Sequence, residues 1–389
     1  MKKKTGILLI FLAAVLAVTG FIQIRREYPD IEKPIINRYI GAVEESAAGS
    51  RFKTYFPGLS PIEKQAYNLI LESIYDMPER ILVPDLSEKQ LDNVFKALLN
   101  DNPDLIFLGR KCRLNSELWN DYISFDYIMT KEEYDKADRE MREKRDLIIA
   151  SLSDLSDEYR CELEVHDYII KNCTYKLEDN NYFYSSAYGA LVNGEAACEG
   201  YSKAAKYVFD KIGIESALVS GKAESDSNKG GGDHMWNIVK INGNYYHLDL
   251  TWDDPVSSNT VAMSLHTYFN LTDDAIGVNH SDFSYSPGCT STDDNYYVRN
   301  GLRFPNFSKS DESRLKELIL KLYNSGEKNI QISFVTKESY DSANSELIKG
   351  GGIYKILSGV RSGRGTDLAR SLSGYYEDAG FFTLTFIFK

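Results

Sequence analysis

Two residues near the middle of the chain, Asn242 and Gly243, constrain the fold more than any other feature of the sequence. An Asn-Gly pair between two runs of alternating apolar residues is a strong signal for a two-residue β-hairpin, because both residues tolerate the positive φ angles of the turn. The flanking runs are therefore expected to form antiparallel strands over residues 235–241 and 244–250. The turn also sets which residues of the two strands face each other.

This register brings a histidine and a carboxylate together. With Ile241 opposite Asn244, His234 faces residue 251, and Asp249 becomes its diagonal neighbour on the same face. The Cβ atoms of such a pair lie about 7–8 Å apart, so the carboxylate can reach the imidazole. His247 has the same parity as Asp249, and we interpret it as a structural residue.

A cysteine at the start of a predicted helix supplies a candidate nucleophile. Cys198 opens the helix expected over residues 197–212, where the positive end of the helix dipole stabilises a thiolate. Taken singly, each residue also fits a packing role, since a free cysteine is usually a small buried apolar residue. Together, Cys198, His234 and Asp249 suit a nucleophilic triad in which the carboxylate orients the imidazole and the imidazole takes the thiol proton.

Three short motifs in this region resemble the signature blocks of the transglutaminase-like superfamily, in the same order. They are Cys198-Glu199-Gly200-Tyr201, His234-x-Trp236, and Tyr245-Tyr246-x-Leu248-Asp249-x-Thr251-Trp252. The resemblance covers residues 160–260, and the flanking segments, including 101–104, look like those of exported bacterial members with a three-part layout.

The resemblance implies a papain-like α+β core with Cys198 as nucleophile, His234 as base and Asp249 as orienting residue. It also implies a thioester intermediate that an amine, water or another nucleophile resolves. The glutamine that papain-type enzymes place before the cysteine is missing, so the backbone N–H of Cys198 is the first expected oxyanion donor and Tyr188 the second. Trp236, like Trp252, is expected to line the cleft or to pack under the hairpin.

The first 24 residues form a separate segment. Lysines at positions 2–4 precede an apolar run from Ile7 to Ile24, a pattern typical of an export signal. As a helix the run would be about 27 Å long, close to a hydrocarbon core of about 30 Å, so an uncleaved membrane anchor fits as well as a cleaved signal peptide. Either way, we expect the remainder to be extracytoplasmic, secreted or anchored at the cell surface.

The composition suits several globular domains, since 43% of the 389 residues are hydrophobic. The predicted fold class is α+β, with a papain-like transglutaminase core between two smaller domains. Within the core we expect helices over 156–173 and 185–193 and a loop over 225–232. The predicted segments are 1–24 (signal or anchor), 25–57 (linker), 58–150 (N-terminal α+β domain), 151–300 (catalytic domain) and 301–389 (C-terminal α/β domain).

The charge pattern argues against nucleic acid as a partner, because the net charge is -12 and no basic cluster is present. The five cysteines are an odd number, and Cys161 and Cys173 share one predicted helix, too far apart to bridge. We expect neither cofactor nor metal, since His266 and His280 stand isolated, without ligand spacing.

The expected function is thiol chemistry on amide bonds of proteins or peptides, with a cell-wall peptide amidase as a more specific variant. Hydrolysis is favoured over crosslinking, because crosslinking needs a cleft that excludes water. A binding or scaffold module on the same fold, without catalysis, is the alternative. The retained triad residues argue against that alternative.

Overall fold

The computed structural model describes residues 49, 51–117, 120–178, 181–225, 228–254 and 265–389. These residues form two compact units: the first ends at Lys131, and the second runs from Glu132 to Lys389 and includes residues 51–52. The predicted domain limits at residues 150 and 300 divide the chain into more parts than these two units, and these limits stay predictions. The predicted export segment, 1–24, lies outside the described residues, and none of the described helices is long and apolar enough to cross a membrane.

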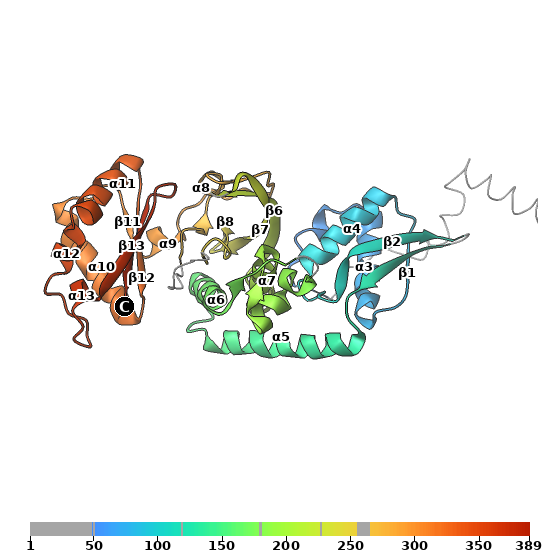
Figure 1. Cartoon of the computed structure of the whole chain (residues 1–389). Helices are drawn as coiled ribbons and strands as arrows, with labels where there is room; N and C mark the ends of the chain where they lie inside the picture. The colour runs from blue at the N-terminus through green and yellow to red at the C-terminus, as the bar shows by residue number, and fades with distance from the viewer. Residues whose placement is uncertain (1–48, 50, 118–119, 179–180, 226–227, 255–264) are drawn as a thin grey trace, which may run out of the picture. The chain divides into compact units, whose positions relative to one another are not determined.

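The first unit packs two helices on a small antiparallel sheet with strand order β1-β3-β2 (Figure 1). The second helix starts with a capping box: Ser87 N donates to Gln90 Oε1 at 2.9 Å, and Gln90 N donates to Ser87 Oγ at 3.3 Å. The elements are α3 (Pro61–Ser73), β1 (Ile81–Val83), α4 (Glu88–Asp101), β2 (Leu108–Ser116) and β3 (Asp121–Tyr127).

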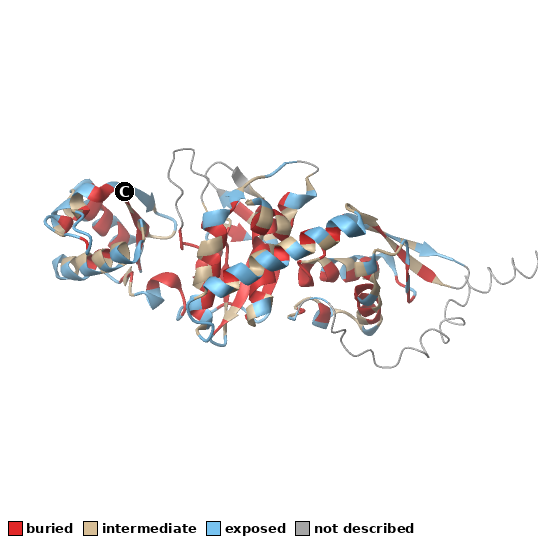
Figure 2. Cartoon of the chain, turned by 90° about the horizontal axis from the view of Figure 1, so that it is seen from below, coloured by how far each residue is buried: buried red, intermediate tan, exposed pale blue. Residues whose placement is uncertain are grey.

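The second unit opens with a long, charged helix, α5 (Lys131–Ser151). Its buried residues, Tyr134, Ala137, Met141 and Ile148, form one stripe at helical spacing, and the opposite side of the helix is exposed (Figure 2). The next helix, α6 (Glu158–Asn172), confirms the helix predicted over residues 156–173.

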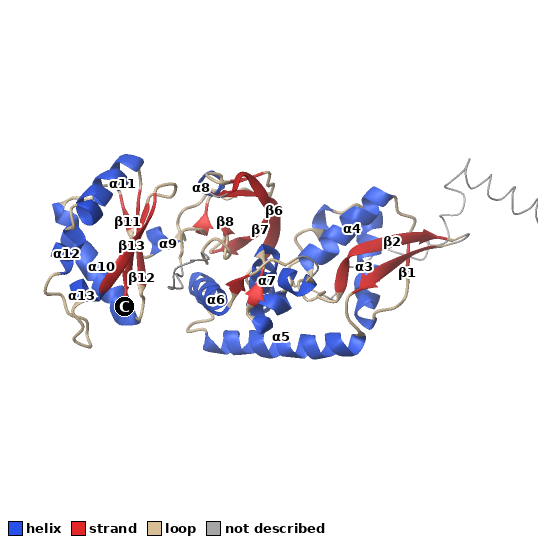
Figure 3. Ribbon diagram, viewed as in Figure 1, coloured by secondary structure: helices blue, strands red, loops and turns tan. Residues whose placement is uncertain are grey.

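The core of the second unit is a five-stranded antiparallel sheet with strand order β10-β6-β7-β8-β9. Helix α7 (Cys198–Ile212) packs against β6 and β7 (Figure 3). The side chain of Asn237 links them, since its Nδ2 donates to the carbonyl of Ser202 on α7 at 3.0 Å. The strands are β6 (Ser216–Ser225), β7 (Asn228–Ile241), β8 (Asn244–Leu248), β9 (Phe269–Leu271) and β10 (His280–Ser281).

The predicted hairpin register is confirmed, since Ile241 pairs with Asn244. The predicted strand 244–250 is too long, however, because β8 ends at Leu248 and the chain turns there. The predicted loop 225–232 is also wrong: β6 and β7 remain paired out to Ser225 and Asn228. The hydrogen bonds between paired strands are made by backbone groups, so the glycines that suggested a loop do not prevent this pairing.

The helix predicted over 185–193 is confirmed in part: residues 187–193 are helical and end in a π-helical turn, Gly189–Asn193, and a separate 3-10 turn, Tyr182–Ser185, precedes them. Ser186 separates them, because its Oγ accepts from the N–H of Gly189 at 3.1 Å and so starts a new turn. Short strands β4 (Thr174–Tyr175) and β5 (Glu195–Ala196) flank this region and pair in parallel.

The last part of the chain forms a four-stranded sheet with order β11-β12-β14-β13. The elements are α8 (Asp273–Ile276), α9 (Tyr296–Arg299), β11 (Arg303–Phe304), α10 (Glu312–Ser325), β12 (Asn329–Phe334), α11 (Lys337–Asn344), α12 (Gly352–Leu357), α13 (Leu368–Ser371), β13 (Leu372–Asp378) and β14 (Thr383–Phe388).

Candidate active site

Cys198 is the first residue of α7, and it is partly exposed. The parallel pairing of β4 with β5 guides the chain into this position. The N-cap residue is Ala197, which has no side-chain acceptor for the N–H groups of the first turn. Those groups and the positive end of the helix dipole therefore favour negative charge on the Cys198 sulfur.

Gly200, in the first turn of the same helix, must be a glycine for steric reasons. A Cβ atom at this position would lie 2.5 Å from the carbonyl oxygen of Tyr184 and 2.8 Å from the Cβ of Ala196. The backbone before the helix thus packs directly on the turn that carries Cys198. This close approach explains the glycine of the Cys-Glu-Gly-Tyr motif.

His234 lies on β7 and faces both partners predicted for it. Its Nε2 contacts Asp249 Oδ2 at 2.6 Å, and Cys198 lies near enough to help raise the pKa of the imidazole. Since Nε2 is engaged with Asp249, the ring nitrogen left for the thiol is Nδ1. The structure therefore brings the three predicted residues together in the order thiol, imidazole, carboxylate.

Asp249 follows the last residue of β8 and is completely buried in the turn that begins there. Its Oδ1 accepts from the backbone N–H groups of Thr251 at 3.0 Å and Trp252 at 3.2 Å. Its Oδ2 contacts His234 at 2.6 Å and His280 at 3.0 Å. The carboxylate is therefore held by four neighbours and has no freedom to turn away from the imidazole.

These contacts determine the charges at the site. Burial acts against a charged imidazole, but the Asp249 carboxylate and Cys198 outweigh it and raise the pKa of His234 to about 10. Burial likewise acts against a charged carboxylate, yet His234 and His280 hold the pKa of Asp249 well below its ordinary value. The structure thus favours an imidazolium beside Cys198 at neutral pH.

The raised pKa of His234 makes a prediction about stability. The stabilisation of the folded state by the charged His234 side chain is fully present below the unfolded-state pKa of about 6.5. It is lost as pH rises toward 10. We expect the difference in unfolding free energy between wild type and His234→Gln to shrink by up to about 1.4 kcal/mol per pH unit in this interval. Urea unfolding between pH 6 and pH 10 measures it, with Lys222→Gln on the neighbouring exposed pair as a control whose effect stays small. A pH-independent difference for His234→Gln would contradict the charged state.

His280 is a site residue that the sequence analysis missed. It was interpreted as isolated, but its Nε2 contacts Asp249 Oδ2 at 3.0 Å and its Nδ1 contacts Asn279 Oδ1 at 2.7 Å. No local signal could have revealed it, because β10 reaches Asp249 only through its pairing with β6. His280 therefore helps to position the carboxylate through the same oxygen that contacts His234.

Trp236 is completely buried and supports His234 rather than lining an open cleft. Its ring stacks with the His234 ring at a centroid distance of 5.8 Å, and its Nε1 donates to His247 Nδ1 at 2.8 Å. Because Nδ1 is the acceptor, Nε2 of His247 carries the proton and donates to Asp273 at 2.8 Å. The interpretation of His247 as structural is thereby supported, and the partly buried Trp252 packs edge-on to His234 at 6.1 Å.

Replacing Trp236 with phenylalanine is expected to lower the unfolding free energy by at least about 1–3 kcal/mol, because the buried Nδ1 of His247 loses its donor. Urea unfolding of Trp236→Phe measures the loss. A double-mutant cycle with His247→Leu isolates the hydrogen bond from the change in ring size. Strictly additive effects in this cycle would show that the bond contributes nothing.

Two tyrosines bear on the oxyanion site. Tyr188, the predicted second donor, uses its hydroxyl to donate to Glu140 Oε2 at 2.7 Å, so it would have to give up that bond. Tyr175 on β4 was not considered from the sequence. Burial raises its pKa, and so do the negative charges of Cys198 and Asp249, so its hydroxyl stays protonated. The register of β4 with β5 pairs Tyr175 with Ala196, two residues before Cys198.

Comparison with known proteins agrees with this geometry. Residues 148–250, which include all three predicted triad residues, match the model of the transglutaminase-like superfamily and form a transglutaminase-like domain. The match supports a cysteine-type enzyme in general and agrees with the observed α+β core, in which a cysteine-bearing helix packs on an antiparallel sheet. No curated protein sequence matches the chain.

Solved structures give only partial likenesses. A proposed cysteine protease from Cytophaga hutchinsonii is 18% identical, with 28% of this chain and 37% of that chain covered and a TM-score of 0.25. A protein described as a TGase is 17% identical, with 52% and 59% covered and a TM-score of 0.28. A proposed protease from Parabacteroides distasonis is 12% identical, with 36% and 30% covered and a TM-score of 0.23. The chain thus spans less than two thirds of each of these proteins.

Proposed function

We propose that the transglutaminase-like domain is a cysteine enzyme that cleaves or transfers the acyl group of protein or peptide amides outside the cytoplasm. The observation that carries the proposal is the Asp249 carboxylate, which is buried, held by four neighbours and directed at the imidazole beside Cys198. A histidine that served only packing would not need an oriented carboxylate on one nitrogen and a thiol on the other.

In the acylation step, the Cys198 sulfur attacks the carbonyl carbon of the substrate amide. The C–N bond breaks and a C–S bond forms, while the proton held by His234 passes to the leaving nitrogen, which departs as ammonia or an amine. Asp249 stays ionised and holds the imidazole in the orientation needed for both transfers. A thioester and a neutral His234 remain.

In the second step, neutral His234 removes a proton from the incoming nucleophile. Attack by water gives a carboxylic acid and restores the thiol, whereas attack by an amine gives a new amide. We favour water, because Cys198 is partly exposed and the transfer reaction needs a cleft that excludes solvent. The products are then those of deamidation or peptide hydrolysis.

The oxyanion of each tetrahedral intermediate is assigned to the backbone N–H of Cys198 and to a tyrosine hydroxyl. Tyr175→Phe is expected to lower kcat by roughly 10- to 100-fold with little change in KM, since its hydrogen bond forms only with the oxyanion. The matched variant Tyr188→Phe, which removes the bond to Glu140, should leave kcat within a few-fold of wild type. Steady-state kinetics of both variants measures these effects. A larger loss of kcat in Tyr188→Phe than in Tyr175→Phe would assign the oxyanion role to Tyr188.

The proposed location rests on the lysines and the apolar run within residues 1–24. An exported enzyme of this kind would meet proteins or peptides of the cell surface, including the peptide stems of a bacterial cell wall. Secreted and membrane-anchored forms both fit this location. Fractionation of cells that express the full chain tests it, and recovery in the cytoplasm would contradict it.

The reaction is tested with purified full-length protein, a glutamine-containing peptide and a primary amine. We expect ammonia release to exceed amine incorporation and both to vanish in Cys198→Ala. Faster incorporation than release would make the protein a crosslinking enzyme. Peptidoglycan fragments replace the peptide in a second assay, where new amino groups would identify a cell-wall amidase. If neither assay responds to Cys198→Ala, the fold serves as a scaffold.

A further inference from the structure

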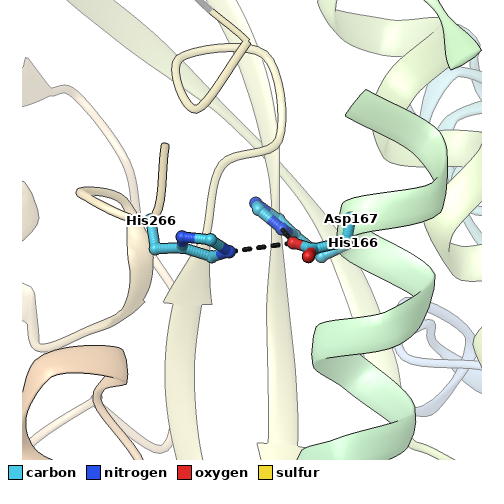
Figure 4. Close-up of side chains that lie close together, drawn as sticks. All are labelled: His166, Asp167 and His266. Carbon is cyan, nitrogen blue, oxygen red and sulfur yellow. Dashed lines mark hydrogen bonds and ion pairs between the residues drawn. The ribbon is translucent and has the colours of Figure 1, made fainter. Parts of the chain in front are cut away.

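A second group of histidine and carboxylate side chains lies in the same unit and takes no part in the thiol chemistry. His166 and Asp167 come from α6, and His266 comes from the segment that leads into β9. Figure 4 shows how the Asp167 carboxylate contacts both imidazole rings. Its Oδ1 lies 3.1 Å from His166 Nδ1 and 2.8 Å from His266 Nε2, and the three potential ligand atoms lie within 4.8 Å of one another.

His166 and Asp167 each have a second polar atom that points away from the cluster, and each of these atoms already has a partner. His166 Nε2 contacts the buried Asp253 Oδ2 at 3.2 Å, and Lys171 Nζ contacts Asp167 Oδ2 at 3.0 Å. A metal-bound histidine typically donates its second N–H to a carboxylate, which orients the ring and makes its free nitrogen more basic. His166 Nδ1 and Asp167 Oδ1 therefore remain as the inward-facing donors.

Aromatic packing holds both rings in place. Tyr296 stacks on His266 with ring centroids 3.9 Å apart, and the edge contact between Phe269 and His166 has a centroid distance of 5.1 Å. The backbone N–H of His266 donates to Gln331 Oε1 at 2.7 Å. Since both imidazoles are almost fully buried, they cannot rotate into solvent to find other partners.

Buried polar atoms surround this group. Glu162 and Asp253 are completely buried, and Asp253 contacts His166, which Asp167 also contacts. Glu162 Oε1 and His266 Nδ1 are buried without a hydrogen-bond partner among the residues that the structure describes. A divalent cation would bind both imidazoles in their neutral form, the form in which histidine binds metals, and Asp167 would supply a negatively charged ligand.

We propose that His166 Nδ1, Asp167 Oδ1 and His266 Nε2 bind a divalent transition metal of the Zn²⁺ type. Two imidazoles and one carboxylate suit Zn²⁺ and its neighbours, whereas Ca²⁺ and Mg²⁺ prefer sites built from oxygen atoms. The metal replaces the hydrogens shared between Asp167 and the two rings, so binding releases protons and weakens in acid. It would join α6 to the segment before β9, next to the turn that carries Asp249 and Asp253.

Two other groups of metal-ligand residues suit a metal less well. In His247, Asp273 and Cys289, the bond from Trp236 leaves the proton on His247 Nε2, the nitrogen that faces Asp273. A protonated nitrogen has no lone pair for a metal. In His234, Asp249 and His280, both rings already contact one carboxylate oxygen of the candidate active site.

The test compares metal binding by variants of the full-length chain, one for each group. The proteins are stripped with a chelator and titrated with Zn²⁺, Ca²⁺ or Mg²⁺, and bound metal is measured by mass spectrometry and calorimetry. Wild type is expected to bind about one Zn²⁺ per chain, as a single three-residue site requires, and to ignore Ca²⁺ and Mg²⁺. His266→Gln and Asp167→Asn should lose the metal, with circular dichroism showing that they remain folded.

Control variants separate this site from the other two groups. Cys289→Ala and His280→Gln should keep the Zn²⁺, and so should Cys198→Ser, which abolishes thiol chemistry without touching α6. Bound Co²⁺ should show ligand-field bands without the charge-transfer band of a thiolate ligand. Absence of Zn²⁺ binding by wild type, or its loss in Cys289→Ala or His280→Gln instead of His266→Gln, would overturn the proposal. None of these results depends on whether the chain cleaves amides.

Discussion

Alkylation of Cys198 by iodoacetamide at pH 6 is expected to slow on the order of 10- to 100-fold when His234 is replaced by alanine. The imidazole of His234, whose pKa is raised to about 10, is positively charged at pH 6, and a positive charge beside a thiol favours its reactive, deprotonated form. An ordinary thiol, with a pKa near 8.5, is less than about 1% ionised at this pH. The gain in thiolate is partly offset, because a stabilised thiolate is a weaker nucleophile.

The measurement follows each cysteine by mass spectrometry against pH. Cys112 is a built-in reference, because it is partly exposed while burial and two nearby aspartates raise its pKa to about 11. It should react slowly in every variant. His234→Gln accompanies the alanine variant, because it fills more of the space beside the buried Asp249 and reveals whether lost reactivity reflects lost structure. Equal labelling of Cys198 in wild type and both variants would mean that the thiol is not activated.

Replacing Asp249 with asparagine is expected to lower kcat by on the order of 10³- to 10⁴-fold while KM changes little. The asparagine oxygen can still accept from the N–H groups of Thr251 and Trp252. Its NH₂ group then faces His234 Nε2, which becomes the acceptor. The proton of the neutral ring moves to Nδ1, so the nitrogen that faces Cys198 can no longer take a proton.

Amide hydrolysis and alkylation measured on the same protein separate orientation from folding. His280→Gln is the matched control, since it removes one of the two histidine contacts to Asp249 and leaves the contact to His234 intact. It should lower kcat far less than Asp249→Asn. A similar loss in both variants would mean that the carboxylate depends on His280 for its position. Unchanged kcat in Asp249→Asn would remove the carboxylate from the mechanism.

Local patterns in the sequence were sufficient for the features that depend on neighbouring residues. The Asn242-Gly243 turn defines the register of β7 and β8 because two residues alone close the hairpin. The start of α7 at Cys198 follows from the residues around it. Together they predicted that a cysteine, a histidine and an aspartate would meet.

Features that depend on distant segments were decided by the tertiary structure. Asp249 reaches His234 from a turn after β8 rather than from a strand, and His280 joins them from a strand that pairs with β6. His266 likewise lies beside His166, although it is 100 residues further along the chain. Such contacts leave no periodic signal, because the side chains are brought together by packing between elements and not by spacing along one of them. The local sequence thus determined which residues form the triad. The packing of the sheet and helices determined which residues surround the triad.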